Sequence, residues 1–114
     1  MKEREVTIER RLLPYAIKRA DTFGMRLKGL MFRRKPLIEE ALHITPCNSI
    51  HMCFMYFPID VVFLDKNKQV VKIIHHLRPW KFIAPVQGAH SVLELPSGAI
   101  NELNIRLGQT LYVG

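Results

Sequence analysis

The sequence lacks the features that mark several large classes of protein. Its 114 residues include only two cysteines, Cys47 and Cys53, which are too few for the disulfide framework of a small secreted domain. Neither a Cys-x-x-Cys nor a His-x-x-x-His spacing occurs, so the usual zinc-binding patterns are absent. No apolar run reaches the ~18 residues that a membrane-spanning helix needs. We therefore expect no bound metal and no membrane insertion.

The N-terminal residues also lack the pattern of a secretory signal. Arg10, Arg11, Lys18 and Arg19 interrupt the first 20 residues, whereas a signal peptide has an unbroken apolar region followed by small residues at its cleavage site. Together with the low cysteine count, this predicts a cytoplasmic protein.

Positive charge is present in excess and is concentrated at one end of the chain. The formal net charge is +7, and residues 1–35 hold 11 of the 17 Lys and Arg against 4 of the 10 Asp and Glu. The other 79 residues hold six of each sign and are neutral. A local positive field attracts anionic partners, such as single-stranded nucleic acid or an acidic protein. A solvated basic face that only maintains solubility is the alternative.

Length and composition predict a single domain that spans residues 1–114. Short apolar or β-branched segments indicate about six strands, and two stretches have the caps and spacing of short helices. Because no strand–helix–strand rhythm occurs, we expect an α+β fold with a mostly antiparallel curved sheet or a small barrel. The clearest element is a hairpin around the turn at residues 65–68, followed by a long loop over 75–89. The predicted strands cover 5–13, 41–45, 59–64, 69–74, 91–95 and 110–113. The predicted helices cover 22–31 and 99–103. Residues 1–35 would thus form a basic strand followed by a helix.

Four motifs occur in order along the chain, and they are Gly29–Arg33, Phe54–Asp65, Pro79–Trp80 and Leu93–Gly98. Through these motifs the chain resembles the domain-of-unknown-function 192 (DUF192) family over about residues 26–113. This resemblance implies a compact β-rich domain and no established activity, cofactor or partner, and we expect no cofactor. Gly108-Gln109 stands where the family usually has Gly-Asp.

Soft metal-ligating side chains alternate in the apolar segment before the hairpin. If residues 50–57 form a strand, His51, Cys53 and Met55 share one face, and these are ligand types that copper favours. Neighbours on one strand face lie about 6.6 Å apart, however, so three in a row diverge unless the chain bends. Packing in the core is the favoured interpretation, since free Cys and Met commonly fill cores.

Two further groups of residues suggest catalysis of a hydrolase type. Asp60 and Glu94 each interrupt an apolar strand, and two such acids could form a catalytic pair or the floor of a ligand site. Alternatively, each accepts hydrogen bonds as a structural clamp. Cys47 lies four residues before His51, and the pair suggests a thiolate nucleophile and its base in a pocket. An inert turn cysteine is the favoured alternative.

The loop after the hairpin combines cations with aromatic residues. Such a mixture suits base stacking and phosphate contact on single-stranded nucleic acid, and also a protein-binding hot spot. Alternatively, Trp80 folds over the core. We predict a binding module that uses a groove between the His51 segment and this loop, with a hydrolase-like enzyme as the alternative. The predicted ligand-binding residues are His51, Met55, Asp60, His75, His76, Arg78, Trp80 and Lys81.

Overall fold

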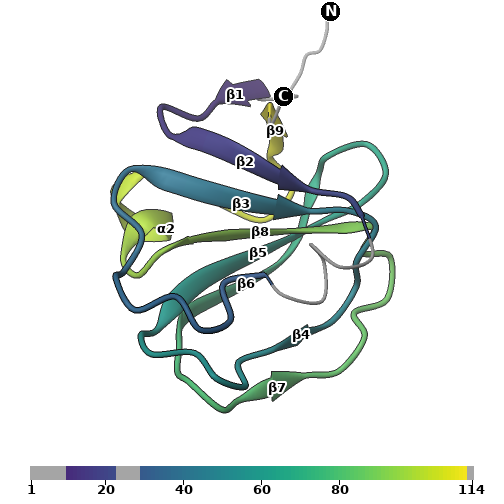
Figure 1. Ribbon diagram of the computed structural model, residues 1–114. Coiled ribbons are helices and arrows are strands. Elements are labelled where there is room, and N and C mark those ends of the chain that lie inside the picture. The colour runs from purple at the N-terminus through teal and green to yellow at the C-terminus, as the bar shows by residue number, and fades with distance from the viewer. Residues whose placement is uncertain (1–9, 23–28, 113–114) are drawn as a thin grey trace, which may run out of the picture.

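The computed structural model describes residues 10–22 and 29–112 (Figure 1). These residues form nine short strands and one helix. In chain order they are β1 (Arg10–Leu12), β2 (Ala16–Ala20), β3 (Glu40–Ile44), β4 (Ile50–His51), β5 (Ile59–Leu64), β6 (Val70–Leu77), β7 (Phe82–Ile83), β8 (Ser91–Pro96), α2 (Ala99–Glu102) and β9 (Thr110–Tyr112).

A mixed five-stranded sheet with the order β2-β3-β8-β5-β6 forms the centre of the fold. Strand β2 runs parallel to β3, and the other three pairs are antiparallel. Because β2 and β6 lie at its two edges, the sheet is open, and the predicted small barrel is wrong for the described residues. Two ribbons accompany the sheet, a parallel one of β1 and β9 and an antiparallel one of β4 and β7.

The hairpin predicted from the sequence is confirmed. Strand β5 pairs with β6 from Ile59–Leu77 to Leu64–Val70. The Asp65 side chain closes the connecting turn, because its Oδ1 accepts the backbone N–H groups of Asn67 and Gln69 at 2.8 and 2.9 Å. All six residues of β5 are buried, since this strand is central and covered on both faces. Its sequence is accordingly apolar at every position except Asp60, rather than alternating.

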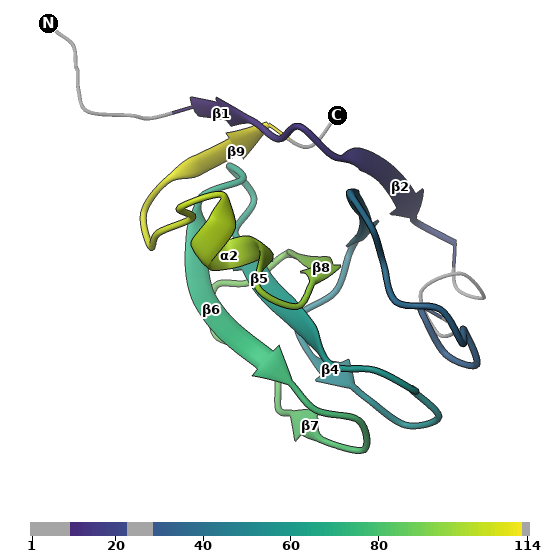
Figure 2. The same cartoon turned by 90° about the vertical axis from the view of Figure 1, so that its left-hand side faces the viewer.

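Apolar side chains pack against both faces of the sheet. Side chains alternate between the faces along each strand, so Val61 and Phe63 lie in one core layer and Val62 and Leu64 in the other. The first layer includes residues of the β4 segment, and the second includes residues of α2 and β9. Figure 2 shows this arrangement, with the β1–β9 ribbon and α2 toward one side and the β4–β7 ribbon toward the other.

The structure describes one of the two predicted helices in full and the other only at its ends. Helix α2 is the one helix in the part of the chain that the structure describes, and it lies where the sequence predicts a helix over 99–103. The other predicted helix covered 22–31, of which residues 23–28 lie outside the described residues. The remainder of that stretch, Gly29–Met31, forms turns, with Gly29 at a φ of 50°.

Two strands lie where the sequence predicts none. Strand β2 has no clear alternation, because Lys18 and Arg19 are adjacent, yet it pairs along β3 as an edge strand, where exposed charges are tolerated. Strand β7 interrupts the long loop predicted over 75–89, and β6 extends to Leu77 before that loop begins. Among residues 10–22 and 29–112, no helix is long and apolar enough to cross a membrane.

Candidate functional site

Three exposed aromatic side chains form a ladder on the surface. The rings of Phe32 and Phe54 stack with their centroids 5.0 Å apart and an interplanar angle of 29°. Trp80 meets Phe54 edge-on, with centroids 5.1 Å apart and an angle of 62°. The exposed fractions of Phe32, Phe54 and Trp80 are 55%, 46% and 63%, so the alternative in which Trp80 covers the core is wrong. Contiguous exposed apolar side chains mark interaction surfaces.

The backbone holds all three ladder residues in a left-handed conformation. Their φ angles are 67° at Phe32, 60° at Phe54 and 68° at Trp80, in a region that bulky side chains rarely adopt and that costs about 1–3 kcal/mol per residue. Hydrogen bonds fix these segments, since the Phe32 N–H donates to the Phe54 carbonyl at 3.0 Å and the Trp80 N–H to the Met52 carbonyl at 2.8 Å. The three exposed rings are therefore held in place by a strained backbone.

Cations and further aromatic side chains lie on the same segments as the ladder. The Arg34 guanidinium lies 5.4 Å from the centroid of the Tyr56 ring, within the range of a cation–π contact. Arg78 and Lys81 flank Trp80 in the chain, and both are exposed, as is the aromatic ring of Phe82. The surface therefore combines flat apolar rings with positive charges.

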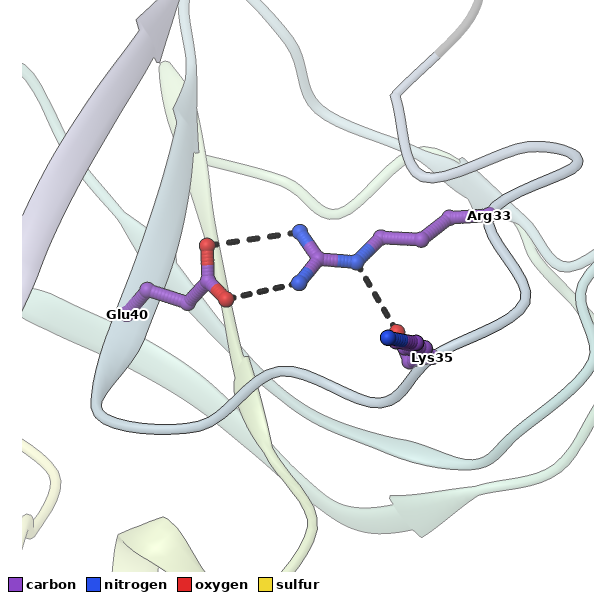
Figure 3. A network of polar contacts seen from close by, with 3 residues as sticks. All are labelled: Arg33, Lys35 and Glu40. Carbon is purple, nitrogen blue, oxygen red and sulfur yellow. Dashed lines mark hydrogen bonds and ion pairs between the residues drawn. The ribbon is translucent and has the colours of Figure 1, made fainter.

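An ion pair ties the segment that carries Phe32 to the central sheet. The Arg33 guanidinium donates to both carboxylate oxygens of Glu40, at 2.6 and 3.3 Å, and its Nε donates to the Lys35 carbonyl at 2.8 Å (Figure 3). These Arg33 hydrogen bonds lower the pKa of Glu40. Because Glu40 begins β3, the clamp fixes residues 33–40 against the sheet and limits the movement of Phe32.

The two segments expected to border an open groove are instead paired with each other. Strand β4 ends at His51, earlier than the strand considered over residues 50–57, and His51 pairs with Phe82 of β7. The Met52 N–H also donates to the Lys81 carbonyl at 2.8 Å. Backbone pairing closes the space between these segments, so the groove predicted there is wrong.

The chain bends after β4 and lines a small cavity. The Met55 N–H donates back to the carbonyl of Met52 at 3.3 Å, which makes a turn where an extended strand was considered. This bend brings His51, Cys53 and Met55 around one cavity of about 50 Å³. The polar and sulfur-containing side chains that line it are Met31, Cys47, Ser49, His51, Cys53, Met55 and Glu94.

Cys47 and His51 share this cavity, but their hydrogen bonds do not suit nucleophilic catalysis. The Cys47 thiol donates to the Ser49 carbonyl, with Sγ and O 3.0 Å apart. His51 Nδ1 accepts the Cys53 N–H at 3.3 Å, so this nitrogen cannot also donate to an orienting carboxylate. An activated thiolate needs a base for its proton and a group that orients the base. The observed hydrogen bonds join Cys47 and His51 to backbone groups instead.

Asp60 is a structural acceptor for three backbone groups. Its exposed fraction is 1%. Its Oδ1 accepts the His76 N–H at 2.9 Å, and its Oδ2 accepts the N–H groups of Gly98 and Ile100 at 3.0 and 2.9 Å. The carboxylate thereby caps the start of α2, where Gly98 supplies no side-chain cap. It also provides an acceptor for the His76 N–H group in the bulge of β6. This bulge lies between the β6 residues that pair with Ile59 and with Val61.

The expectation that Asp60 and Glu94 meet in one pocket is corrected by the strand register. Asp60 lies opposite Leu95, and Glu94 lies opposite Val61. Residues directly opposite one another share a face of the sheet, and Leu95 and Val61 belong to different core layers. The sheet therefore separates the two carboxyl groups.

Glu94 is buried without a full set of hydrogen bonds. Its exposed fraction is 4%, and its Oε1 has no hydrogen-bond partner in the structure. Burial raises its pKa to about 8, because the charged form is poorly solvated there. Glu94 is therefore protonated at neutral pH, and its carboxyl group lines the cavity.

The two histidines expected in the loop belong instead to the end of β6. His75 and His76 are exposed, and His76 Nδ1 lies 2.6 Å from the Ser97 hydroxyl oxygen. In the described ranges, no three His, Cys, Asp or Glu side chains are arranged to hold a metal ion.

The sequence did not point to the other two residues of the ladder, Phe54, which contacts Trp80, and Phe32, which stacks on Phe54. Both belong to motifs that carry the family resemblance, Gly29–Arg33 and Phe54–Asp65, and this was the available signal. Their contact depends on left-handed turn conformations, which propensities for bulky residues do not predict.

The mixed open sheet, with its two ribbons and single described helix, defines a small β-rich domain. The chain belongs to the DUF192 family, described as an uncharacterised ACR, whose profile matches residues 4–113. The resemblance carried by the sequence motifs is thereby confirmed.

Archaeal relatives are similar over most of the chain. A UPF0127 protein of Thermococcus sibiricus is 42% identical over 101 residues, covering 83% of this chain and 64% of that protein. The chain thus spans less than two-thirds of that relative. A UPF0127 protein of Pyrococcus furiosus is 36% identical over 115 residues, covering 96% of this chain and 90% of that protein.

Solved bacterial structures share the fold. A protein of unknown function from Novosphingobium aromaticivorans has a TM-score of 0.74 at 25% identity, covering 82% of this chain and 71% of that one. A proposed transcription regulator from Sinorhizobium meliloti has a TM-score of 0.73 at 22% identity, covering 81% and 76%. The second likeness concerns the fold alone.

Proposed function

We propose that the protein binds single-stranded nucleic acid through the ladder of Phe32, Phe54 and Trp80. The observation that supports this proposal is that three exposed rings touch one another and are held by left-handed backbone. Unpaired bases stack on exposed aromatic rings, and each stack contributes about 1–3 kcal/mol with little preference for the base. A rigid ladder loses little conformational entropy when a strand binds, which favours affinity.

Positive charge near the ladder suits the phosphates of such a strand. Arg34 is exposed on the segment that carries Phe32, and Arg78 and Lys81 are exposed on the segment that carries Trp80. A hollow of about 430 Å³ also begins beside Phe32 and is lined by Lys18 of β2. Its volume is in the range of sites for small organic molecules, so a nucleotide next to the stacked bases would find both space and a cation.

An acidic protein is the second anionic partner that the sequence suggested. The same rings would suit a protein hot spot, but single-stranded nucleic acid is favoured because flat rings and interleaved cations match bases and phosphates together. A hydrolase-like activity draws support from the shared cavity of Cys47 and His51, and it is disfavoured by their hydrogen bonds. Binding would take place in the cytoplasm, the compartment predicted from the sequence.

The experiment is a titration of a dye-labelled oligothymidylate, followed by fluorescence anisotropy. We expect Trp80→Ala to weaken binding by about 5- to 150-fold, the equivalent of one lost stack. Tyr112→Ala is the matched control, because Tyr112 is another exposed aromatic residue and lies on β9. Three phosphate contacts predict that log K falls with log salt with a slope of about −2.

Two results would contradict the proposal. Equal losses for the Trp80 and Tyr112 variants would show that the ladder is not the binding surface. Absence of oligonucleotide binding by the intact protein at low salt would favour the protein hot spot instead.

A further inference from the structure

The Glu94 cavity is separate in chemistry from the aromatic ladder and has an open hydrogen-bonding position. The unpartnered Oε1 of Glu94 belongs to a side chain with an exposed fraction of 4% that lines the cavity. Gly29 lines the same cavity, and a Cβ added to it would lie 4.0 Å from Glu94 Oε1. Buried polar atoms almost always have a partner, so an unpartnered carboxyl oxygen at a cavity indicates that a ligand supplies one.

The surroundings of Glu94 favour the neutral form of its carboxyl group. The residues opposite it on the neighbouring strands are Leu42 of β3 and Val61 of β5, which are apolar and cannot pair with a charge. Lys18 lies one strand beyond Leu42 and is exposed. The other titratable groups that line the cavity are Cys47, His51 and Cys53.

We propose that this cavity binds a small uncharged group, such as an amide or a hydroxyl, whose acceptor atom takes a hydrogen bond from the Glu94 carboxyl group. A protonated carboxyl group offers one donor and one acceptor, which matches a primary amide. The apolar part of such a ligand would contact Leu30, Ile44, Ile50 and Met55, which complete the wall.

The size of the cavity limits the ligand to a few atoms. A cavity of 150 Å³ holds benzene, and one water molecule occupies about 30 Å³ of liquid. A volume of about 50 Å³ therefore accepts a group of two to four non-hydrogen atoms, or the end of a longer molecule. A metal ion is a poorer candidate, since the described residues contain no suitable cluster of ligands.

Two probes of the same shape test the proposal, namely acetamide and acetamidinium. Each is titrated into labelled protein at about pH 6 and about pH 10, on either side of the Glu94 pKa of about 8, and the backbone amide shifts of the lining residues are followed. Acetamide is expected to bind saturably at the lower pH. Acetamidinium is expected to bind only at the higher pH, where Glu94 is ionised.

Variants separate the role of the Glu94 carboxyl group from that of the other polar groups in the cavity. Glu94→Gln keeps a donor and an acceptor, so acetamide should bind within about twofold of the normal affinity at both pH values, and acetamidinium should not bind. If Glu94→Gln still admits acetamidinium at high pH, a cavity thiol or His51 is responsible, and the proposal is overturned.

A second pair of variants tests the location. Gly29→Ala narrows the cavity next to Glu94 Oε1. This variant should weaken the binding of acetamide about fourfold, as expected for one lost methylene contact. Gly108→Ala is the control for backbone strain, because Gly108 also has a positive φ, of 86°, but no atom lies within 4 Å of an added Cβ. Equal effects of the two variants, or no saturable shifts with any probe, would overturn the proposal and leave a cavity that holds only water. Trp80→Ala should leave acetamide binding unchanged, so this test is independent of nucleic-acid binding.

Discussion

Replacement of Glu94 by Gln is expected to change how the stability of the protein depends on pH. Burial raises the pKa of Glu94 from 4.5 to about 8. Because the folded state holds the proton more tightly than the unfolded state, the stabilising contribution is complete below pH 4.5 and is lost as the pH rises toward about 8. A pH of 7 lies about 2.5 units above the unfolded-state pKa of 4.5. This difference corresponds to a loss of about 3 kcal/mol in the free energy of unfolding.

Urea unfolding of both proteins between about pH 4.5 and pH 8 measures this loss. The free energy of unfolding of the original protein should fall by about 3 kcal/mol more than that of Glu94→Gln between pH 4.5 and pH 7. Every other ionisable group is the same in the two proteins, so its contribution cancels in the difference. Glu39→Gln is a control at an exposed acid and should follow the original protein. Parallel curves for the original protein and Glu94→Gln would refute the argument that Glu94 is buried without a partner.

Three further substitutions test other parts of the structure. Asp60→Asn should lower the free energy of unfolding by about 3 kcal/mol in urea, because an amide cannot accept all three N–H groups; a loss below about 1 kcal/mol would contradict the clamp. Burial, with a smaller effect of the Lys68 charge, lowers the pKa of His43 from 6.5 to about 4, so stability present above pH 6.5 should fall by about 3 kcal/mol toward pH 4. His43→Phe should remove this fall in acid unfolding curves, and an unchanged curve would show that His43 is not the cause. Glu40→Gln breaks a half-exposed pair with Arg33 and should change stability by less than about 1 kcal/mol. It should also weaken oligonucleotide binding about twofold in the anisotropy titration, because the Phe32 segment is less fixed; unchanged affinity would show that this clamp does not support the ladder.

Local patterns in the sequence were sufficient to predict the hairpin and to single out several site residues. The turn at residues 65–68 lies between β-branched segments, and the hairpin depends on these adjacent segments alone. Asp60 stood out because an acid within an apolar strand must find donors, and the structure supplies three. Trp80 stood out through its neighbouring cations.

Features that depend on contacts between distant segments were not predictable in this way. The exposed strand β2 owes its conformation to pairing with β3 rather than to its own alternation. The opposite orientation of Asp60 and Glu94 follows from a register that no local pattern shows.

The cavity and the ladder both depend on one bend in the chain. An extended strand over residues 50–57 would have spread His51 and Met55 apart, but the turn there gathers them at the cavity. The same turn places Phe54 at a φ of 60° between Phe32 and Trp80. Aromatic residues rarely adopt this conformation, so the sequence indicated neither arrangement.

The most direct test of the proposed function uses Trp80 itself, the single tryptophan of the chain. Its fluorescence is recorded while an oligothymidylate, or an abasic chain with the same number of phosphates, is added at low salt. Stacking of bases on the ladder predicts saturable quenching by the oligothymidylate and little change with the abasic chain. Equal responses to both chains would show that only charge attracts the strand, and this result would contradict the proposed role of the aromatic ladder.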